Sequence, residues 1–298
     1  MADVKAVIPW ANEIPQGAFI TSSPTYKVGE YFSRFHKDSF VPESFAQMDY
    51  YFYDPTEHGY EKGREYPLLI FLHGTTNALE GDVCINYAGA EFYAKEEYQK
   101  TLGGAYLLLP LANEYRDEEG KCRGAWCNEY VRPVYELINS FIQKHTLANG
   151  GVSKKIVLGN SSGATMCFRM VDAYTGFFNA LVPIGSGAIP DDSMLDLYDQ
   201  NNVALFYAMG KHDEFNDFEN EIVPRLPRLR HMKNCYVFTP EWVYNGDHGI
   251  SSINFGVEMG QHCLINPMHC NLKFDDGTPM EPELPDGITG WLKSSVIG

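Results

Sequence analysis

The feature that most constrains the fold of this chain is a series of short apolar runs that do not alternate with polar residues. The runs lie at 66–72, 105–111, 156–158, 180–184 and 203–209. Runs of this length without alternation are typical of strands buried on both faces of a parallel sheet. An aromatic segment at 48–53 ends in Asp-Pro and predicts a further strand.

Amphipathic segments lie between these runs. At 131–145 the apolar residues recur near helical spacing, and 164–174 and 288–296 follow the same pattern. Strands that alternate with helices predict an α/β fold with a mostly parallel sheet.

The 298 residues contain no internal repeat, no low-complexity tract and no linker rich in Pro, Gly or Ser. We therefore expect a single domain over 1–298, since α/β folds of this length often form one unit. Residues 1–45 are rich in Pro and aromatic side chains and are interpreted as an N-terminal extension with leading antiparallel strands. Only residues 185–202 separate two of the apolar runs, which predicts a small lid or none.

The charge balance constrains the partners. Lys and Arg number 23 against 39 Asp and Glu, a formal net charge of −16. This field repels phosphate, so we expect no nucleic acid and no anionic membrane as a partner. No apolar run reaches the ~18 residues that a membrane span needs. No signal-peptide pattern begins the sequence, which predicts a cytoplasmic protein. A secreted protein whose signal peptide had been removed would have the same sequence.

Seven cysteines, an odd number, occur at spacings that do not match a zinc site. We expect no metal and mostly free thiols. If a disulfide forms, Cys263 and Cys270 are the first pair to consider.

The strongest chemical signal is Gly159-Asn-Ser161-Ser-Gly163, which follows an apolar run and precedes a helical pattern. In a strand–turn–helix context, Gly-x-Ser-x-Gly places a serine hydroxyl on a sharp turn above the sheet. Small residues at both ends let the backbone pass closely. The motif therefore predicts Ser161 as a nucleophile. The alternative is a Gly/Ser turn in which serine only caps the helix.

A second signal, Leu72-His73-Gly-Thr75-Thr, ends the apolar run at 66–72. In this type of fold a loop at this place supplies one oxyanion donor, and the residue after the nucleophile supplies the other. The pattern predicts the backbone N–H groups of Thr75 and Ser162 as this pair. The alternative is a tight turn with a structural histidine.

An acidic segment follows the run at 203–209. It contains Asp213 and Glu214, with Asp217 shortly after. A carboxylate here would orient a histidine and stabilise its protonated form. Asp213 is the favoured residue, with Glu214 and Asp217 as competitors, and a solvated charged turn is the non-catalytic alternative.

Three histidines after Asp213 are candidates for the base: His248, His262 and His269. A strand-like stretch at 253–259 leads through a glycine to His262, which favours this residue. The sequence does not exclude the other two.

Together these motifs resemble the α/β-hydrolase superfamily, and within it the serine esterases of the feruloyl-esterase and polyhydroxybutyrate-depolymerase-like branch. Arg-Gly-Ala-Trp-Cys-Asn at 123–128 is similar to that branch too, and the likeness covers residues 66–298. The resemblance implies an eight-stranded sheet and hydrolysis of carboxylic esters without a cofactor, with Ser161, Asp213 and His262 as the triad. The cysteines and the long segment at 268–285 depart from the branch and put its substrate in doubt.

Aromatic residues make up 14% of the chain and could stack on a phenolic or sugar group. Trp126 and Tyr87 are candidates for such walls, although both could equally be core residues. The expected substrate is a phenolic or carbohydrate ester, as a small molecule or linked to a polysaccharide. An acetylesterase, polyester hydrolase, acyltransferase or peptidase on the same triad remains open, as does a noncatalytic binding protein, and the sequence does not indicate an oligomeric state.

Overall fold

A computed structural model describes residues 20–22, 31–79, 90–240, 242–244, 252–254, 257–259 and 281–298, together with residues 262, 271, 273 and 279. No described helix combines the length and the apolar character that crossing a bilayer would require.

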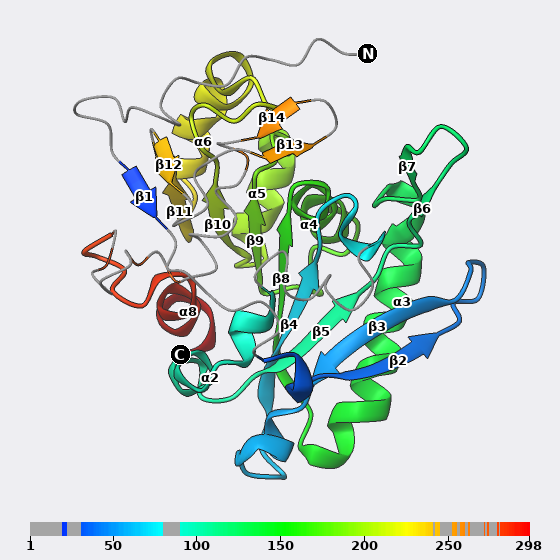
Figure 1. Ribbon diagram of the computed structural model, residues 1–298. Coiled ribbons are helices and arrows are strands. Elements are labelled where there is room, and N and C mark those ends of the chain that lie inside the picture. Colours follow the sequence, from blue (N-terminus) through cyan, green and yellow to red (C-terminus); the bar gives the residue numbers. More distant parts are fainter. Residues whose placement is uncertain are drawn as a thin grey trace.

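The centre of the molecule is an eight-stranded sheet with the order β11-β10-β9-β8-β4-β5-β3-β2 (Figure 1). Its strands are β2 (His36–Phe40), β3 (Met48–Tyr53), β4 (Tyr66–Leu72), β5 (Tyr106–Pro110), β8 (Val152–Asn160), β9 (Ala180–Ile184), β10 (Ala204–Ala208) and β11 (Cys235–Phe238). The strands from β11 to β5 run parallel, and β3 and β2 are antiparallel to their neighbours. The predicted α/β class is thereby confirmed.

Short strand pairs lie outside this sheet: β1 (Ile20–Ser22) with β12 (Trp242–Tyr244), β6 (Tyr115–Arg116) with β7 (Cys122–Arg123), and β13 (Ser252–Asn254) with β14 (Val257–Met259). Within residues 1–45, β2 runs antiparallel to β3 as expected, whereas β1 pairs in parallel with β12. The single strand-like stretch at 253–259 is wrong in detail: it is two antiparallel strands. Gly256 interrupts the apolar run, and a glycine inside such a run is a turn signal.

Helices cover both faces of the sheet (Figure 1). The helices are α2 (Glu96–Leu102), α3 (Val131–Phe141), α4 (Ser162–Ala173), α5 (Asp192–Gln200), α6 (Leu226–Arg230) and α8 (Gly287–Leu292). The buried apolar residues of α3, α4, α5 and α6 form one core cluster with one side of the sheet. Those of α2 and α8 form a second cluster with the other side.

Shorter helical turns complete the layers. They are η2 (Phe32–Arg34), η3 (Pro55–His58), η5 (Ala90–Ala94), η6 (Asn128–Tyr130), η7 (Ile142–Thr146), η8 (Leu147–Asn149), η9 (Phe218–Ile222), η10 (Val223–Arg225) and η13 (Lys293–Ile297). The connection between β9 and β10 contains α5, whose Leu195 and Tyr198 are buried in the core. This connection is therefore part of a helical layer.

The parallel direction of β4, β5, β8, β9 and β10 brings their C-terminal ends to one edge of the sheet. In open α/β sheets, ligands bind at this edge. The loops that leave these ends contain the residues that the sequence singled out.

Candidate active site

Ser161 lies on the sharp turn between β8 and α4. Its backbone has φ 54° and ψ −116°, a conformation that residues other than glycine rarely adopt. The N–H of Ser161 donates to the carbonyl of Ile184 at the end of β9 (2.9 Å). A Cβ at Gly163 would lie 2.0 Å from the carbonyl oxygen of Leu72, so only glycine permits the start of α4 to pack against the end of β4. The geometry is that of a strained strand–turn–helix elbow.

The loop that follows β4 lies against this elbow. A Cβ at Gly74 would be 3.6 Å from the Cβ of Ser161. The buried ring of His73 anchors the loop: Nδ1 donates to the Gly74 carbonyl (2.7 Å), and Nε2 accepts the N–H of Ala112 beyond β5 (3.0 Å). These partners assign the proton to Nδ1, so His73 is neutral and holds two loops together.

Three other side chains fix the same loop. Trp126 donates its indole N–H to the His73 carbonyl (2.9 Å), and the side-chain oxygen of Asn77 accepts the N–H of Gly74 (2.8 Å). The carboxylate of Glu114 accepts the N–H groups of Thr76 (2.9 Å) and Ala78 (3.0 Å).

Thr75 lies in the middle of this bonded loop. Among the described residues, no acceptor takes the N–H of Thr75 or that of Ser162, the first residue of α4. Within the described part of the chain, two N–H groups are thus left without an acceptor, one on Ser162 and one in the loop that borders Ser161.

The acidic segment after β10 places three carboxylates in different surroundings. Asp213 is buried, and its Oδ2 lies 2.6 Å from Nδ1 of His262. Glu214 accepts the backbone N–H of His262 (2.8 Å). Asp217 caps η9 by accepting the N–H of Asn220 (3.1 Å). Of the three, Asp213 is the carboxylate that bonds the ring of His262.

The ring of His262 is buried and also contacts Phe215, with 4.8 Å between the ring centroids. A Cβ at Gly185 would lie 3.4 Å from Cε1 of His262 and 4.0 Å from the backbone nitrogen of Ser161. Gly185, at the end of β9, thus borders both residues. The fold brings together Ser161, Asp213 and His262, which the sequence places up to 101 positions apart (262 − 161).

In the buried pair, Asp213 and His262 each stabilise the charged form of the other. Burial lowers the pKa of His262, but the carboxylates of Asp213 and Glu214 outweigh it, and the pKa is raised overall. Burial raises the pKa of Asp213, but His262 and the hydrogen bonds from Asn216 and Phe215 outweigh that effect, and its pKa is lowered overall. Asp213 is therefore ionised at neutral pH and favours a proton on His262.

The remaining predicted residues have varied outcomes. Trp126 is only 5% exposed and bonds the loop after β4, which is the environment of a positioning residue. Tyr87, His248, His269 and the pair Cys263 and Cys270 lie outside the described residues. Cys122, Cys127, Cys167 and Cys235 are free thiols. In the described part of the chain, no group of His, Cys, Asp and Glu side chains is arranged to hold a metal ion.

Sequence reasoning missed Glu114, Asn77 and Phe215. Glu114 follows the end of β5, and β5 is the parallel neighbour of β4, so the two ends meet at one edge. A polar residue just beyond the adjacent strand was the available signal. Asn77 and Phe215 each lie two residues beyond a predicted site residue, Thr75 and Asp213, and their types gave no signal.

No family model and no curated protein sequence matches this chain. Solved structures do. A thermostable esterase superposes with a TM-score of 0.53 at 18% identity, over 80% of this chain and 60% of that one. The chain thus spans less than two thirds of that esterase. Est1E from Butyrivibrio proteoclasticus (TM-score 0.47, 14% identity) matches over 70% of this chain and 89% of its own. The feruloyl esterase module from Clostridium thermocellum (TM-score 0.46, 11% identity) matches over 84% and 94%. At 18% identity the likeness to the thermostable esterase shows a shared fold.

Proposed function

On the premise of this α/β-hydrolase fold, we propose that the chain is a serine carboxylesterase, with Ser161 as nucleophile, His262 as base and Asp213 as the acid that orients it. One observation above all supports this proposal. A buried carboxylate–histidine pair, with 2.6 Å between Oδ2 of Asp213 and Nδ1 of His262, borders the same glycine as the strained Ser161 turn. Such an arrangement recurs in enzymes that transfer acyl groups.

The reaction would proceed in two halves. Because Nδ1 of His262 bonds Asp213, Nε2 is the nitrogen left to take the proton of Ser161 Oγ. Oγ attacks the ester carbonyl, and the tetrahedral intermediate collapses as His262 returns the proton to the leaving alcohol. His262 then takes a proton from water, which attacks the acyl-enzyme. As the second tetrahedral intermediate collapses, the bond to Oγ breaks, His262 returns this proton to Ser161 Oγ, and the carboxylic acid leaves. The proposed cycle needs no cofactor, because groups of this chain and water supply every proton transfer.

The oxyanion would bind at the N–H groups of Thr75 and Ser162. Both lack an acceptor among the described residues, and the loop holding Thr75 is fixed by Trp126, Asn77 and Glu114. Preorganised donors of this kind stabilise charge that develops only in the transition state, and loss of one donor typically costs about 10²–10³ in kcat.

The proposed substrate is an ester with an apolar or aromatic group, of the phenolic or carbohydrate-linked kind. Phe215 supports this choice, because its side chain is 46% exposed although its ring touches His262. An aromatic face kept exposed beside the base can contact the part of a substrate next to the reacting carbonyl.

The first test compares hydrolysis of 4-nitrophenyl acetate and methyl ferulate by wild type, Ser161→Ala, His262→Ala and His248→Ala. We expect Ser161→Ala and His262→Ala each to lower kcat by about 10⁴ or more, with His248→Ala near wild type. Full activity of Ser161→Ala, or no ester turnover by wild type, would refute the proposal and leave a noncatalytic protein. Faster cleavage of a peptide than of esters would indicate that the chain is a peptidase.

The substrate class has a separate test in Phe215→Ala. We expect this change to lower kcat/KM for methyl ferulate by about 10-fold, from loss of one apolar contact, and to change turnover of 4-nitrophenyl acetate by less than about 3-fold. Val223→Ala, an exposed apolar side chain on η10 (38% exposed), is the matched control. Equal effects of Phe215→Ala on both esters would remove the argument for an aromatic acyl group.

A further inference from the structure

Glu114, in the segment after β5, bonds two backbone N–H groups of the loop after β4. Both carboxylate oxygens of Glu114 are used, one by the N–H of Thr76 and the other by the N–H of Ala78. These two bonds follow Thr75 in the chain. Before Thr75, the N–H of Gly74 donates to the side chain of Asn77. The peptide that contains the Thr75 N–H is thus tied on both sides.

The loop needs this tie because its backbone is strained. Thr76 has φ 76°, in the left-handed region that β-branched residues avoid. Such a residue keeps its conformation only where its surroundings over-determine it. Glu114 bonds the N–H of this strained residue, so it opposes relaxation at the point where the strain lies.

Glu114 is itself held in place. The N–H of its neighbour Asn113 donates to the hydroxyl of Tyr130 (2.8 Å), which donates to the carbonyl of Gly124 (2.7 Å). A Cβ at Gly124 would lie 2.1 Å from the carbonyl oxygen of Asn113, so this close contact requires glycine. The segment that presents Glu114 is therefore a rigid base for the loop.

We propose that Glu114 is a positioning residue of the site, which aims the N–H of Thr75 at the oxyanion by fixing the peptides of Thr76 and Ala78. This role rests on the proposed esterase function. The charge of Glu114 does not explain this role. Glu114 bonds the residue next to Thr75, and a carboxylate so close to a developing oxyanion destabilises that oxyanion. The benefit is geometric, because a donor misplaced by about 1 Å can cost 10²-fold in rate.

The surroundings of Glu114 fit this role. Burial raises the pKa of Glu114, and the N–H groups of Thr76 and Ala78 partly offset the effect. The neighbouring thiol of Cys122 on β7 has a raised pKa, from burial and from the Glu114 carboxylate, and so stays neutral. A partly desolvated carboxylate is costly, and the two N–H bonds offset that cost only if they are well formed.

The test is Glu114→Gln. The new side chain has the same shape, but its amide nitrogen is a donor and would face one of the two backbone N–H groups. The matched control is Glu119→Gln in the turn of the β6–β7 hairpin, which begins directly after Glu114. Glu119 is exposed and pairs with Lys121. Turnover of 4-nitrophenyl acetate is measured per active site, with the sites counted by titration with an alkyl fluorophosphonate. Binding of phenylboronic acid, which mimics the tetrahedral intermediate, is measured in parallel.

For Glu114→Gln we expect kcat per titrated site to fall by about 10- to 100-fold, with KM within about 2-fold and boronate affinity lowered by a similar factor to kcat. Glu119→Gln should match wild type. Unchanged kcat per site and boronate affinity would overturn the positioning role alone. A loss of titratable sites with unchanged kcat per site would also overturn it, because the role would then be structural. Absence of Ser161-dependent turnover in wild type would overturn the proposed function first.

Discussion

Asp213 is fixed independently of the histidine that it orients. Its Oδ1 accepts the N–H groups of Phe215 (2.9 Å) and Asn216 (3.1 Å) and the side-chain amide of Asn216 (2.8 Å). The side-chain oxygen of Asn216, Oδ1, accepts the N–H of Gly187 after β9 (3.0 Å). The carboxylate therefore has one oxygen committed to the loop and the other free to bond His262.

Asp213→Asn tests whether the charge of Asp213 is needed at the oxygen that bonds His262. The amide still fits the loop, but it does not stabilise a positively charged imidazole, so we expect kcat to fall by about 10⁴. Asp213 raises the pKa of His262, while burial lowers it. Removing the carboxylate therefore lowers the pKa of His262. In the pH profile of any residual activity, the loss of activity on the acidic side should then occur at a lower pH than in wild type. A loss that stays at the same pH, measured as kcat/KM against pH, would mean that another group titrates.

The sequence predicted the residue types of the site better than their partners. Ser161 and Asp213 follow buried strands, so apolar runs locate them. The signal for His262 was weaker, because the strand-like stretch at 253–259 that favoured it is two short antiparallel strands. The sequence did not indicate the contact of Trp126 either. Its indole bonds the carbonyl of His73, which lies 53 positions earlier (126 − 73), just after β4.

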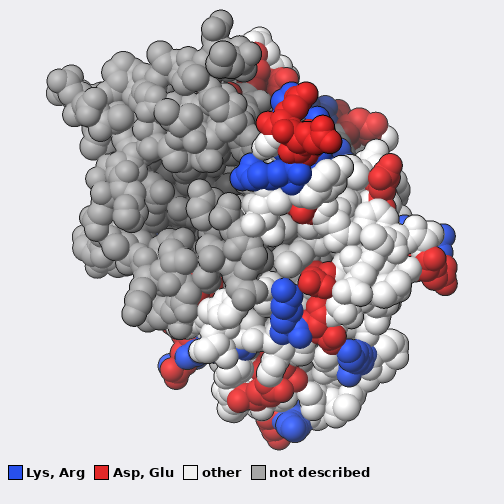
Figure 2. Space-filling model, turned by 45° about the vertical axis from the view of Figure 1, so that its right-hand side comes forward, with Lys and Arg blue, Asp and Glu red and all other residues white. Residues whose placement is uncertain are grey.

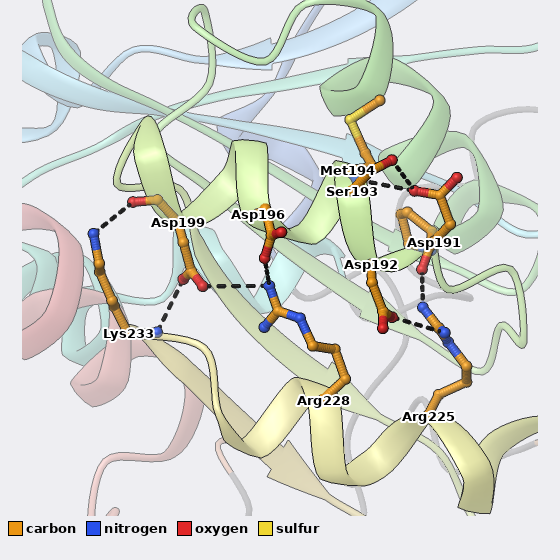
Figure 3. Close-up of polar contacts among 10 residues, drawn as sticks. Asp191, Asp192, Ser193, Met194, Asp196, Asp199, Arg225, Arg228 and Lys233 are labelled. Carbon is orange, nitrogen blue, oxygen red and sulfur yellow. Dashed lines mark hydrogen bonds and ion pairs between the residues drawn. The ribbon is translucent and has the colours of Figure 1, made fainter.

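At the scale of elements, α5 and α6 are joined by a set of charged contacts (Figure 3). Arg228 reaches Asp196 (2.6 Å) and Asp199 (3.5 Å), and Arg225 reaches Asp192 (2.9 Å). The N–H of Lys233 donates to Asp199 (2.9 Å). These contacts hold α6 and the residues on both sides of it against α5. The helix α6 lies in the connection from β10 that contains Asp213.

Arg228→Ala measures the strength of this connection. The side chain of Arg228 is only 19% exposed, and that of Asp199 is 17% exposed, so the pair is poorly screened by water. We expect a loss of about 1–2 kcal/mol in the free energy of unfolding, measured with urea.

Arg132→Ala is the matched control, because Arg132 also bonds two carboxylates, Glu43 and Glu136, but is 60% exposed. Its loss should be about 0.5 kcal/mol or less. Equal losses for the two arginines would show that burial does not strengthen the α5–α6 contacts.

The elements themselves were largely predictable. The bounds of β3, β4 and β9 equal the predicted runs, because strands buried on both faces need continuous apolar residues. The β13–β14 pair was not, because a turn within a short apolar segment leaves too few residues for either period to appear.

At the scale of the whole molecule, acid stability depends on more than the net charge of −16. On the described part of the face in view, Figure 2 shows acidic and basic side chains in small mixed groups separated by uncharged surface. Surface groups so placed contribute little each. His73 differs, because burial lowers its pKa from 6.5 to about 4. A protonated His73 would also lose its bond from the N–H of Ala112.

His73 should therefore make the fold sensitive to acid. A group whose pKa is depressed on folding contributes stability above its unfolded pKa and loses it as the pH falls through the folded value. For His73 this window runs from pH 6.5 to about 4, with a contribution of about 3 kcal/mol. His73→Gln keeps a donor and an acceptor but does not titrate. We expect its unfolding free energy to fall less than that of wild type between these pH values, and parallel curves would contradict the assignment.

His262, the proposed base, is held by consecutive residues of one loop. Asp213 bonds the ring of His262 and Glu214 bonds its backbone N–H, so both contacts come from across the fold. In evolutionary terms, the proposed base and the chain that delivers it are separable. Insertions or exchanges near His262 can accumulate while two acidic residues keep the ring in register. New substrate ranges can then arise by drift in that part of the chain, with the chemistry inherited unchanged.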